Sequence, residues 1–222
     1  MLGFSAPRPQ YRLLNNTMKI KLFFSPSSPY VRKCLVVAAE VGLADIIELL
    51  PGSPHPVTRD QSIVVDNPLG KIPTLITEDG QSLYDSRVIC EYLNSVGQGN
   101  LIPTENSLRW NALTLQSLAD GILDAALLIR YETNVRPNSL RWPDWINGKF
   151  DAIHTSLTYL NQHPKVFEQN FHLGLLTIGC AFWYLDLRYP ELDWRKKYPE
   201  LAEASGSVLN RPSMQRSWTI PT

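Results

Sequence analysis

The sequence predicts an α/β unit followed by an all-helical unit. Between residues 19 and 96, short apolar runs that suit strands alternate with stretches whose apolar residues have helical spacing. The sequence Gly-Gln-Gly-Asn at 97–100 interrupts this alternation and is typical of a connection. Beyond it, apolar residues recur at intervals of three and four, which indicates helices alone.

The first unit is expected to begin with a βαβ arrangement. A strand is predicted at Lys19–Phe24 and a helix at Pro29–Glu40, with Gly42 placed to end the helix. A second strand is predicted at Ile46–Leu50. After a proline-rich loop, one short helical turn is expected at 59–66.

A ββα arrangement should follow. The strand predicted at Pro73–Thr77 should pair antiparallel with Ser82–Tyr84, because Glu78-Asp79-Gly80 between them is a hairpin signal. Asp85 and Ser86 then have side chains that can cap the N-terminus of another helix. The apolar positions of that helix have the spacing of one buried face, at Val88, Ile89, Tyr92 and Leu93.

Helices account for the rest of the chain. Four are expected, at Leu108–Tyr131, Trp145–Leu160, Leu173–Leu187 and about Arg195–Ala204. The third is apolar nearly all round, which places it at the centre of a bundle. The expected division is a tail at 1–17, an α/β domain at 18–97, a linker at 98–104 and a helical domain at 105–222.

Composition excludes several classes of function. Lys plus Arg equals Asp plus Glu at 21 each, so there is no basic surplus for nucleic acid. Three cysteines, spread along the chain and odd in number, are not a disulfide framework and suit a reducing, cytoplasmic compartment. The most apolar stretch, 173–185, is too short to span a membrane. Residues 1–17 are interpreted as a tail, or as sequence upstream of a start at Met18.

The four histidines lack ligand spacing, so no metal site is expected. We expect them at the surface or in loops, at His55, His154, His163 and His172.

The serine-rich sequence SPSSPYVRK at 25–33 lies between the first strand and the first helix. Pro29 suits the first helical position, which makes Ser28 the N-cap. A plain cap would explain this serine. The same geometry also favours an anion such as a thiolate, because a helix N-terminus presents free N–H groups and the positive end of the dipole.

Two further stretches carry candidate binding groups. In NPLGKIPTL, a proline opens a strand at Ile72-Pro73, a position where a cis peptide is tolerated. In YDSRVICEYL, Asp85 and Ser86 lie at a helix start, where they could hold a substrate carboxylate and its neighbouring ammonium. A plain cap is again the alternative.

Taken together, SPYVRK, NPLGKIPTL, the DG turn and YDSRVICEYL resemble the glutathione transferase superfamily over essentially the whole length from Met18. The first motif, with Leu118-Ala-Asp-Gly-Ile-Leu-Asp-Ala, most resembles a serine-type bacterial subgroup. The resemblance implies a thioredoxin-like N-terminal domain and a helical C-terminal domain. It implies glutathione as co-substrate, no metal or other cofactor, a small electrophile as second substrate, a role in detoxification and a homodimer.

Residue roles follow from the same resemblance. Ser28 matches the residue that activates the thiol, with Ser25 as the rival. Ile72-Pro73 matches the dipeptide that pairs with the cysteinyl backbone, and Asp85-Ser86 matches the pair that holds the γ-glutamyl group. Lys71, His55 or Arg59 could meet the glycyl carboxylate.

The second-substrate pocket is expected between the domains. Its candidate side chains lie on the helix Leu108–Tyr131, at Trp110, Leu113, Ser117, Asp120 and Arg130. The other open interpretations are a non-catalytic interaction module of the same fold and a glutathione-dependent isomerase or dehalogenase. Serine at position 28 cannot form a mixed disulfide, so thiol transfer is disfavoured. Cys34 should be buried core.

One departure from the family pattern concerns the central C-terminal helix. Many members start it with Ser or Thr followed three residues later by Asp, but here the stretch is His172-Leu-Gly-Leu175. Another capping group is therefore needed.

Overall fold

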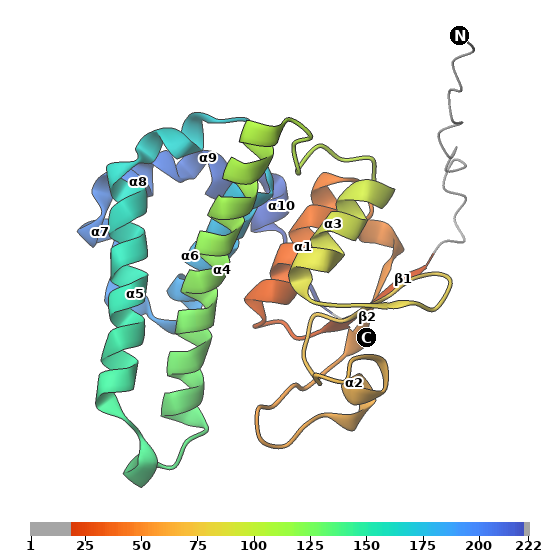
Figure 1. Ribbon diagram of the computed structural model, residues 1–222, viewed down its shortest axis with the longest axis horizontal. Helices are drawn as coiled ribbons and strands as arrows, with labels where there is room; N and C mark the ends of the chain where they lie inside the picture. The colour runs from red at the N-terminus through yellow and green to blue at the C-terminus, as the bar shows by residue number, and fades with distance from the viewer. Residues whose placement is uncertain (1–18, 220–222) are drawn as a thin grey trace.

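The computed structural model describes residues 19–219, so the tail predicted at 1–17 lies outside the described residues. A four-stranded sheet with helices forms the first half, and helices alone form the second (Figure 1). This is the thioredoxin-like domain followed by a helical domain that the sequence predicts. The segment between them, 97–105, contains no helix or strand.

The sheet has strand order β2-β1-β3-β4. Strand β1 (Ile20–Phe24) runs parallel to β2 (Ile47–Pro51) and antiparallel to β3 (Leu75–Ile76), which pairs antiparallel with β4 (Ser82–Leu83). The central position of β1 fits its burial, since only Lys21 of its five residues is exposed. The predicted hairpin is present, with Gly80 in the left-handed conformation that its turn requires.

Three helices and one 3₁₀ turn complete the described part of this domain. Their bounds are α1 Pro29–Glu40, the 3₁₀ turn Ala44–Ile46, α2 Gln61–Asp66 and α3 Ser86–Val96. Helix α1 has the predicted limits, because Pro29 fits its first position and Gly42, with positive φ, follows its last turn.

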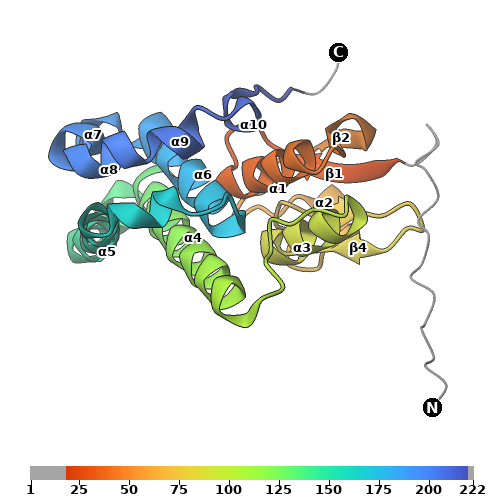
Figure 2. The same ribbon diagram turned by 90° about the horizontal axis from the view of Figure 1, so that it is seen from above.

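The second domain is built around three long helices, α4 Asn106–Asn134, α5 Pro143–Gln162 and α6 Leu173–Arg188. By length and composition α4 could cross a membrane, but its apolar side packs against α5 and α6 as the core helix of this bundle. Helix α6 is buried nearly all round and also packs on α1, which joins the domains (Figure 2).

The C-terminal part differs from the sequence prediction. The single helix expected at about Arg195–Ala204 is two helices, because Pro199 lacks an N–H and begins a new helix after Tyr198. The short elements of the second domain are the 3₁₀ turns Asn138–Leu140, Pro164–Glu168 and Pro190–Leu192 and the helices α7 Trp194–Lys197, α8 Pro199–Ala204, α9 Gly206–Leu209 and α10 Pro212–Gln215.

Candidate functional site

Ser28 is the N-cap of α1, as predicted. Its Oγ accepts a hydrogen bond from the Val31 N–H at 3.3 Å, and its carbonyl accepts one from the Arg32 N–H at 3.0 Å. Pro29 has no N–H, and the Tyr30 N–H has no hydrogen-bond partner among residues 19–219. The first turn of α1 therefore offers two donors to a ligand, the Ser28 hydroxyl proton and the Tyr30 amide, at the positive end of the helix dipole.

Ser25 lies in the same loop, at its junction with β1. Its carbonyl accepts a hydrogen bond from the Ser28 N–H at 3.1 Å, which closes the turn between the two serines. Like Ser28, it is half-buried. Both hydroxyls therefore remain candidates, and only Ser28 combines a hydroxyl with the helix N-terminus.

The Ile72–Pro73 peptide bond is cis. The N–H and C=O of Ile72 make no hydrogen bond within the described residues, so this short backbone segment is available for pairing. The sheet fixes its place beside the loop Ser25–Ser28, which we call the serine loop, since the Phe23 N–H donates to the Thr74 carbonyl at 2.9 Å. An extended peptide backbone could therefore pair with Ile72 next to the serine loop.

His55, Arg59 and Lys71, the residues expected to bind a glycyl carboxylate, differ in the hydrogen bonds that their side chains already make. His55 accepts two local backbone hydrogen bonds through Nδ1, and the Arg59 guanidinium donates to the Pro68 carbonyl. Lys71 is exposed, and its ammonium has no partner in the described part of the chain. Of the three side chains, that of Lys71 is therefore the most available to bind a carboxylate.

Asp85 and Ser86 start α3 beside α1. The Asp85 carboxylate caps the helix by accepting the Arg87 N–H at 2.9 Å and remains exposed, whereas Ser86 is buried. The Cys34 Sγ lies 3.9 Å from the Ser86 carbonyl oxygen, which places the start of α3 against α1. The serine loop, Ile72 and the start of α3 therefore follow one edge of the first domain.

Asp120 does not line an open pocket, which corrects its place among the predicted pocket residues. Only 2% of it is exposed, and its carboxylate lies 2.7 Å from the ammonium of the fully buried Lys33 and 3.0 Å from the Arg87 Nε. Burial lowers the pKa of Lys33, but the Asp120 carboxylate outweighs it, so the pKa is raised and Lys33 stays charged. Asp120 instead joins α4 to α1 and α3.

A contact that the sequence did not indicate lies at the first turn of α1. The Tyr30 hydroxyl donates to the Asp124 carboxylate of α4. Burial raises the pKa of Tyr30, and the neighbouring Asp124 charge raises it further, so the phenol stays protonated. The part of α4 beside the Ser28 loop is therefore the stretch around Asp124 (Figure 1).

Other predicted pocket residues lie nearer the start of α4. Trp110 is 63% exposed, and Ser117 with Leu113 lines a separate small hollow of about 250 Å³ beside Arg87. Of Trp110, Ser117 and Asp120, only Ser117 lines this hollow. An amphipathic pattern on α4 predicts which residues share a face, but it does not tell which turn lies opposite Ser28.

His172 lies in the loop before α6, as expected, but it is only 5% exposed and caps that helix, whereas His154 lies within α5 and is half-buried. Among residues 19–219 no three His, Cys, Asp or Glu side chains form a group that could hold a metal. Cys34 is fully buried as predicted, and its Sγ lies 4.0 Å from that of Cys90. Burial raises the pKa of the Cys34 thiol well above its ordinary value, so it is a poor nucleophile.

Comparison with known proteins identifies relatives of this chain. The family model "Glutathione S-transferase, N-terminal domain" matches residues 27–96, which contain Ser28, Ile72-Pro73 and Asp85-Ser86. A curated relative, the uncharacterized GST-like protein YibF of Escherichia coli K12, is 29% identical over 203 residues, covering 89% of this chain and 98% of its own.

Two solved structures match over nearly their full length. A glutathione transferase family member from Pseudomonas fluorescens Pf-5 with bound glutathione is 42% identical, with a TM-score of 0.86, and the match covers 90% of this chain and 98% of that chain. A glutathione S-transferase from Methylobacillus flagellatus KT with GSH bound is 35% identical, with a TM-score of 0.77, over 89% and 98% of the two chains.

Proposed function

Because the chain belongs to the glutathione S-transferase superfamily, we propose that it binds glutathione along the edge described above and transfers its thiolate to a small electrophile. The relatives from Pseudomonas and Methylobacillus hold glutathione in their structures, which supports the first half of this proposal. The observation that carries the second half is the pair of free donors, Ser28 O–H and Tyr30 N–H, at the start of α1.

Glutathione would be held at three points. The N–H and C=O of Ile72 would pair with the backbone of its cysteinyl residue. Asp85 would hold the γ-glutamyl ammonium, and the Ser86 hydroxyl with the N-terminus of α3 would hold the neighbouring carboxylate. Lys71 would meet the glycyl carboxylate.

These contacts would place the thiol near the Ser28 hydroxyl. A free thiol has a pKa of about 8.5 and is mostly protonated at neutral pH. Hydrogen bonds to the thiolate and the dipole of α1 would lower that pKa. A shift of about two units corresponds to roughly 2.7 kcal/mol and makes thiolate the major form. The thiolate would then attack an electrophilic carbon, and the leaving group would depart with its electron pair.

The experiment follows the thiolate absorbance of bound glutathione across pH. In the wild type the thiol should titrate about two units below its free value, and Ser28→Ala should raise this apparent pKa by one to two units, on the order expected for a lost charged hydrogen bond. Ser25→Ala and Ser27→Ala are matched controls in the same loop and should leave it unchanged.

Three other results would each replace part of the proposal. If glutathione does not bind at millimolar concentration, the chain is an interaction module. If Ser25→Ala rather than Ser28→Ala abolishes the shift, Ser25 is the activating residue. If Ser28 lowers the thiol pKa but only cis-trans or halogenated substrates turn over, the protein is a glutathione-dependent isomerase or dehalogenase.

A further inference from the structure

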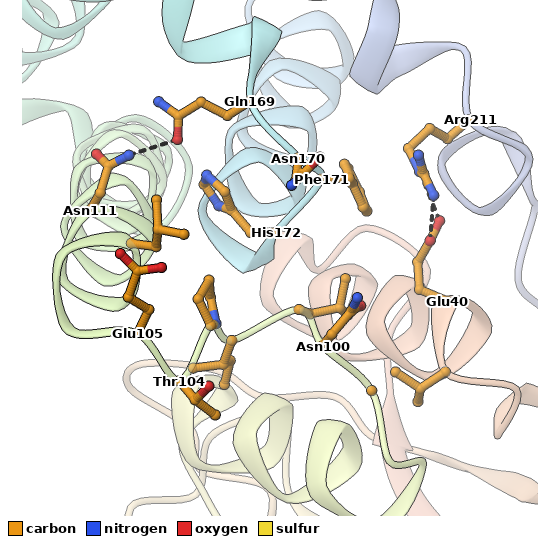
Figure 3. A pocket seen from close by; sticks show the side chains of 16 residues that line it. Glu40, Asn100, Thr104, Glu105, Asn111, Gln169, Asn170, Phe171, His172 and Arg211 are labelled. Atoms are coloured by element: carbon orange, nitrogen blue, oxygen red, sulfur yellow. Dashed lines mark hydrogen bonds and ion pairs between the residues drawn. The ribbon is translucent and has the colours of Figure 1, made fainter.

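A cavity of about 1030 Å³ lies where the connection between the domains passes the start of α4 (Figure 3). We call it the linker cavity. Its lining comes from the end of α1, the connection, the start of α4 and the loop before α6, and includes Glu40, Thr104, Glu105, Asn111, His172 and Arg211. Glu40 ends α1 and Ser28 precedes its first residue, so the length of a 12-residue helix, about 18 Å, separates this cavity from the glutathione edge.

His172 gives the cavity an unused hydrogen-bond donor. Its Nδ1 accepts the Gly174 N–H at 3.1 Å and the Leu175 N–H at 3.4 Å, so the ring proton of the neutral imidazole is on Nε2. Nε2 is buried and has no partner among the described residues. An unpaired buried donor is unfavourable, and an acceptor that reached it would remove that cost.

Two hydrogen-bonded side chains of the lining lie beside this imidazole. The Asn111 Nδ2 donates to the Gln169 Oε1 at 2.7 Å, and Figure 3 shows the imidazole lying beside this pair. Both side chains are at least partly exposed, so the pair can open at the cost of one solvent-exposed hydrogen bond. An acceptor group could enter there and meet Nε2.

The start of α4 adds further donors. This 29-residue helix has no side-chain cap, so the N–H groups of its first turn lack a side-chain acceptor, and Leu108 is the residue of that turn that lines the cavity. Apolar side chains form much of the remaining wall, among them Ile102, Leu108 and Phe171. The cavity therefore combines a few hydrogen-bond donors with an apolar surface, the usual composition of a small-molecule site.

The charges of the lining select an uncharged ligand. Glu40 and Arg211 neutralise each other through hydrogen bonds of 3.0 and 2.6 Å. Burial lowers the pKa of His172, so its imidazole stays neutral. Glu105 is the remaining charged residue of the lining, and it is negative. A carboxylate would meet no free cation here and would be repelled by Glu105.

We propose that the linker cavity binds an uncharged, largely apolar molecule through a carbonyl oxygen, which accepts the Nε2–H of His172. The site is separate from the glutathione edge and does not depend on the function proposed for it.

Prodan, an uncharged naphthyl ketone whose emission shifts to the blue when it passes from water to less polar surroundings, is a suitable probe. It should bind the wild type with a blue shift, and saturating glutathione should not displace it. His172→Asn should weaken binding about tenfold, because asparagine can still cap α6 but lacks the Nε2 donor. Thr104→Trp should narrow the cavity at its wall and weaken binding, whereas Thr114→Trp, an exposed α4 position outside the lining, should not.

The controls separate this site from others. Naphthoate should compete at least tenfold more weakly than acetonaphthone, its uncharged counterpart. The proposal is overturned if prodan does not bind, if glutathione displaces it, if naphthoate competes better than the ketone, or if both His172→Asn and Thr104→Trp bind prodan like the wild type. Thermal unfolding of each variant shows whether it is folded. If His172→Asn does not fold, prodan binding to Thr104→Trp still tests the proposal.

Discussion

At the scale of single residues, the start of α1 is held against the middle of α4 by a small set of polar contacts. Lys33 and Asp120 are both buried and bind each other at 2.7 Å, and Tyr30 donates to Asp124 one turn further along α4. A charged pair that is taken out of water is tolerated only when both partners are present. The position of the Ser28 loop against α4 therefore depends on Asp120.

Asp120→Ala is expected to lower the free energy of unfolding by about 3 kcal/mol, because it leaves the Lys33 ammonium buried without a counter-charge. Urea unfolding followed by circular dichroism would measure this. Arg87→Ala is the matched control, since the Arg87 side chain is 52% exposed and its pair with Asp120 should contribute less than about 1 kcal/mol.

A double variant with Lys33→Met and Asp120→Leu should recover much of the loss, since it removes both charges together. Equal stability of Asp120→Ala and the wild type would show that the buried pair is not what holds α4 against α1.

At the scale of elements, α6 is a nearly fully buried helix that begins with a histidine. His172 replaces the serine or threonine cap of many family members by accepting two N–H groups through Nδ1. Protonation of Nδ1 would place a donor against two donors and end this capping. The start of the central helix is therefore sensitive to acid.

The pH dependence has a definite sign. Burial lowers the pKa of His172 below its ordinary 6.5, so the unfolded chain takes up the proton first. The contribution of the His172 cap to the free energy of unfolding is complete above about pH 6.5, and it is lost as pH falls through the lower pKa of His172 in the folded state. Urea unfolding between pH 7.5 and pH 5 should therefore show a larger loss for the wild type than for His172→Asn, which cannot titrate.

Identical slopes for the two proteins across that range would contradict the role of His172 as a titrating cap.

At the scale of the whole molecule, α1 and α6 join the two domains, while α3 and the exposed side of α4 lie on one face (Figure 1). Helices α3 and α4 carry large apolar side chains that remain exposed, at Val88 on α3 and at Trp110 and Leu128, which lie on the same side of α4. Exposed apolar surface of this kind often marks a protein interface. We propose that a second copy of the chain packs on it by a two-fold axis, in agreement with the dimer implied by the family resemblance.

Light scattering after gel filtration should give twice the chain mass for the wild type. Val88→Glu and Trp110→Glu should each shift the protein toward the monomer, because a buried unpaired carboxylate destabilises an interface. Trp142→Glu is the matched control, as Trp142 is similarly exposed and lies before α5 rather than on this face. A wild-type monomer, or a dimer that only Trp142→Glu disrupts, would exclude this interface.

The sequence by itself determined the fold class, the order of the main elements and the local chemistry of the helix starts. The Ser28 cap, the Asp85 cap and the limits of α1 depend on residues within a few positions of one another, so spacing and residue type suffice to predict them. The helix break at Pro199 also depends on a single residue, because proline lacks an N–H. The residues on both sides suit a helix, so the sequence pattern predicts one helix where the structure has two.

Only the tertiary structure decided which distant groups meet. Asp120 has the helical spacing of a residue facing the other domain, but its partners Lys33 and Arg87 come from helices far away in the chain. The burial of His172 and the existence of the linker cavity likewise depend on how α4, α6 and α1 pack. Periodicity specifies the face on which a side chain lies, whereas the opposing side chain is set by the packing of whole helices.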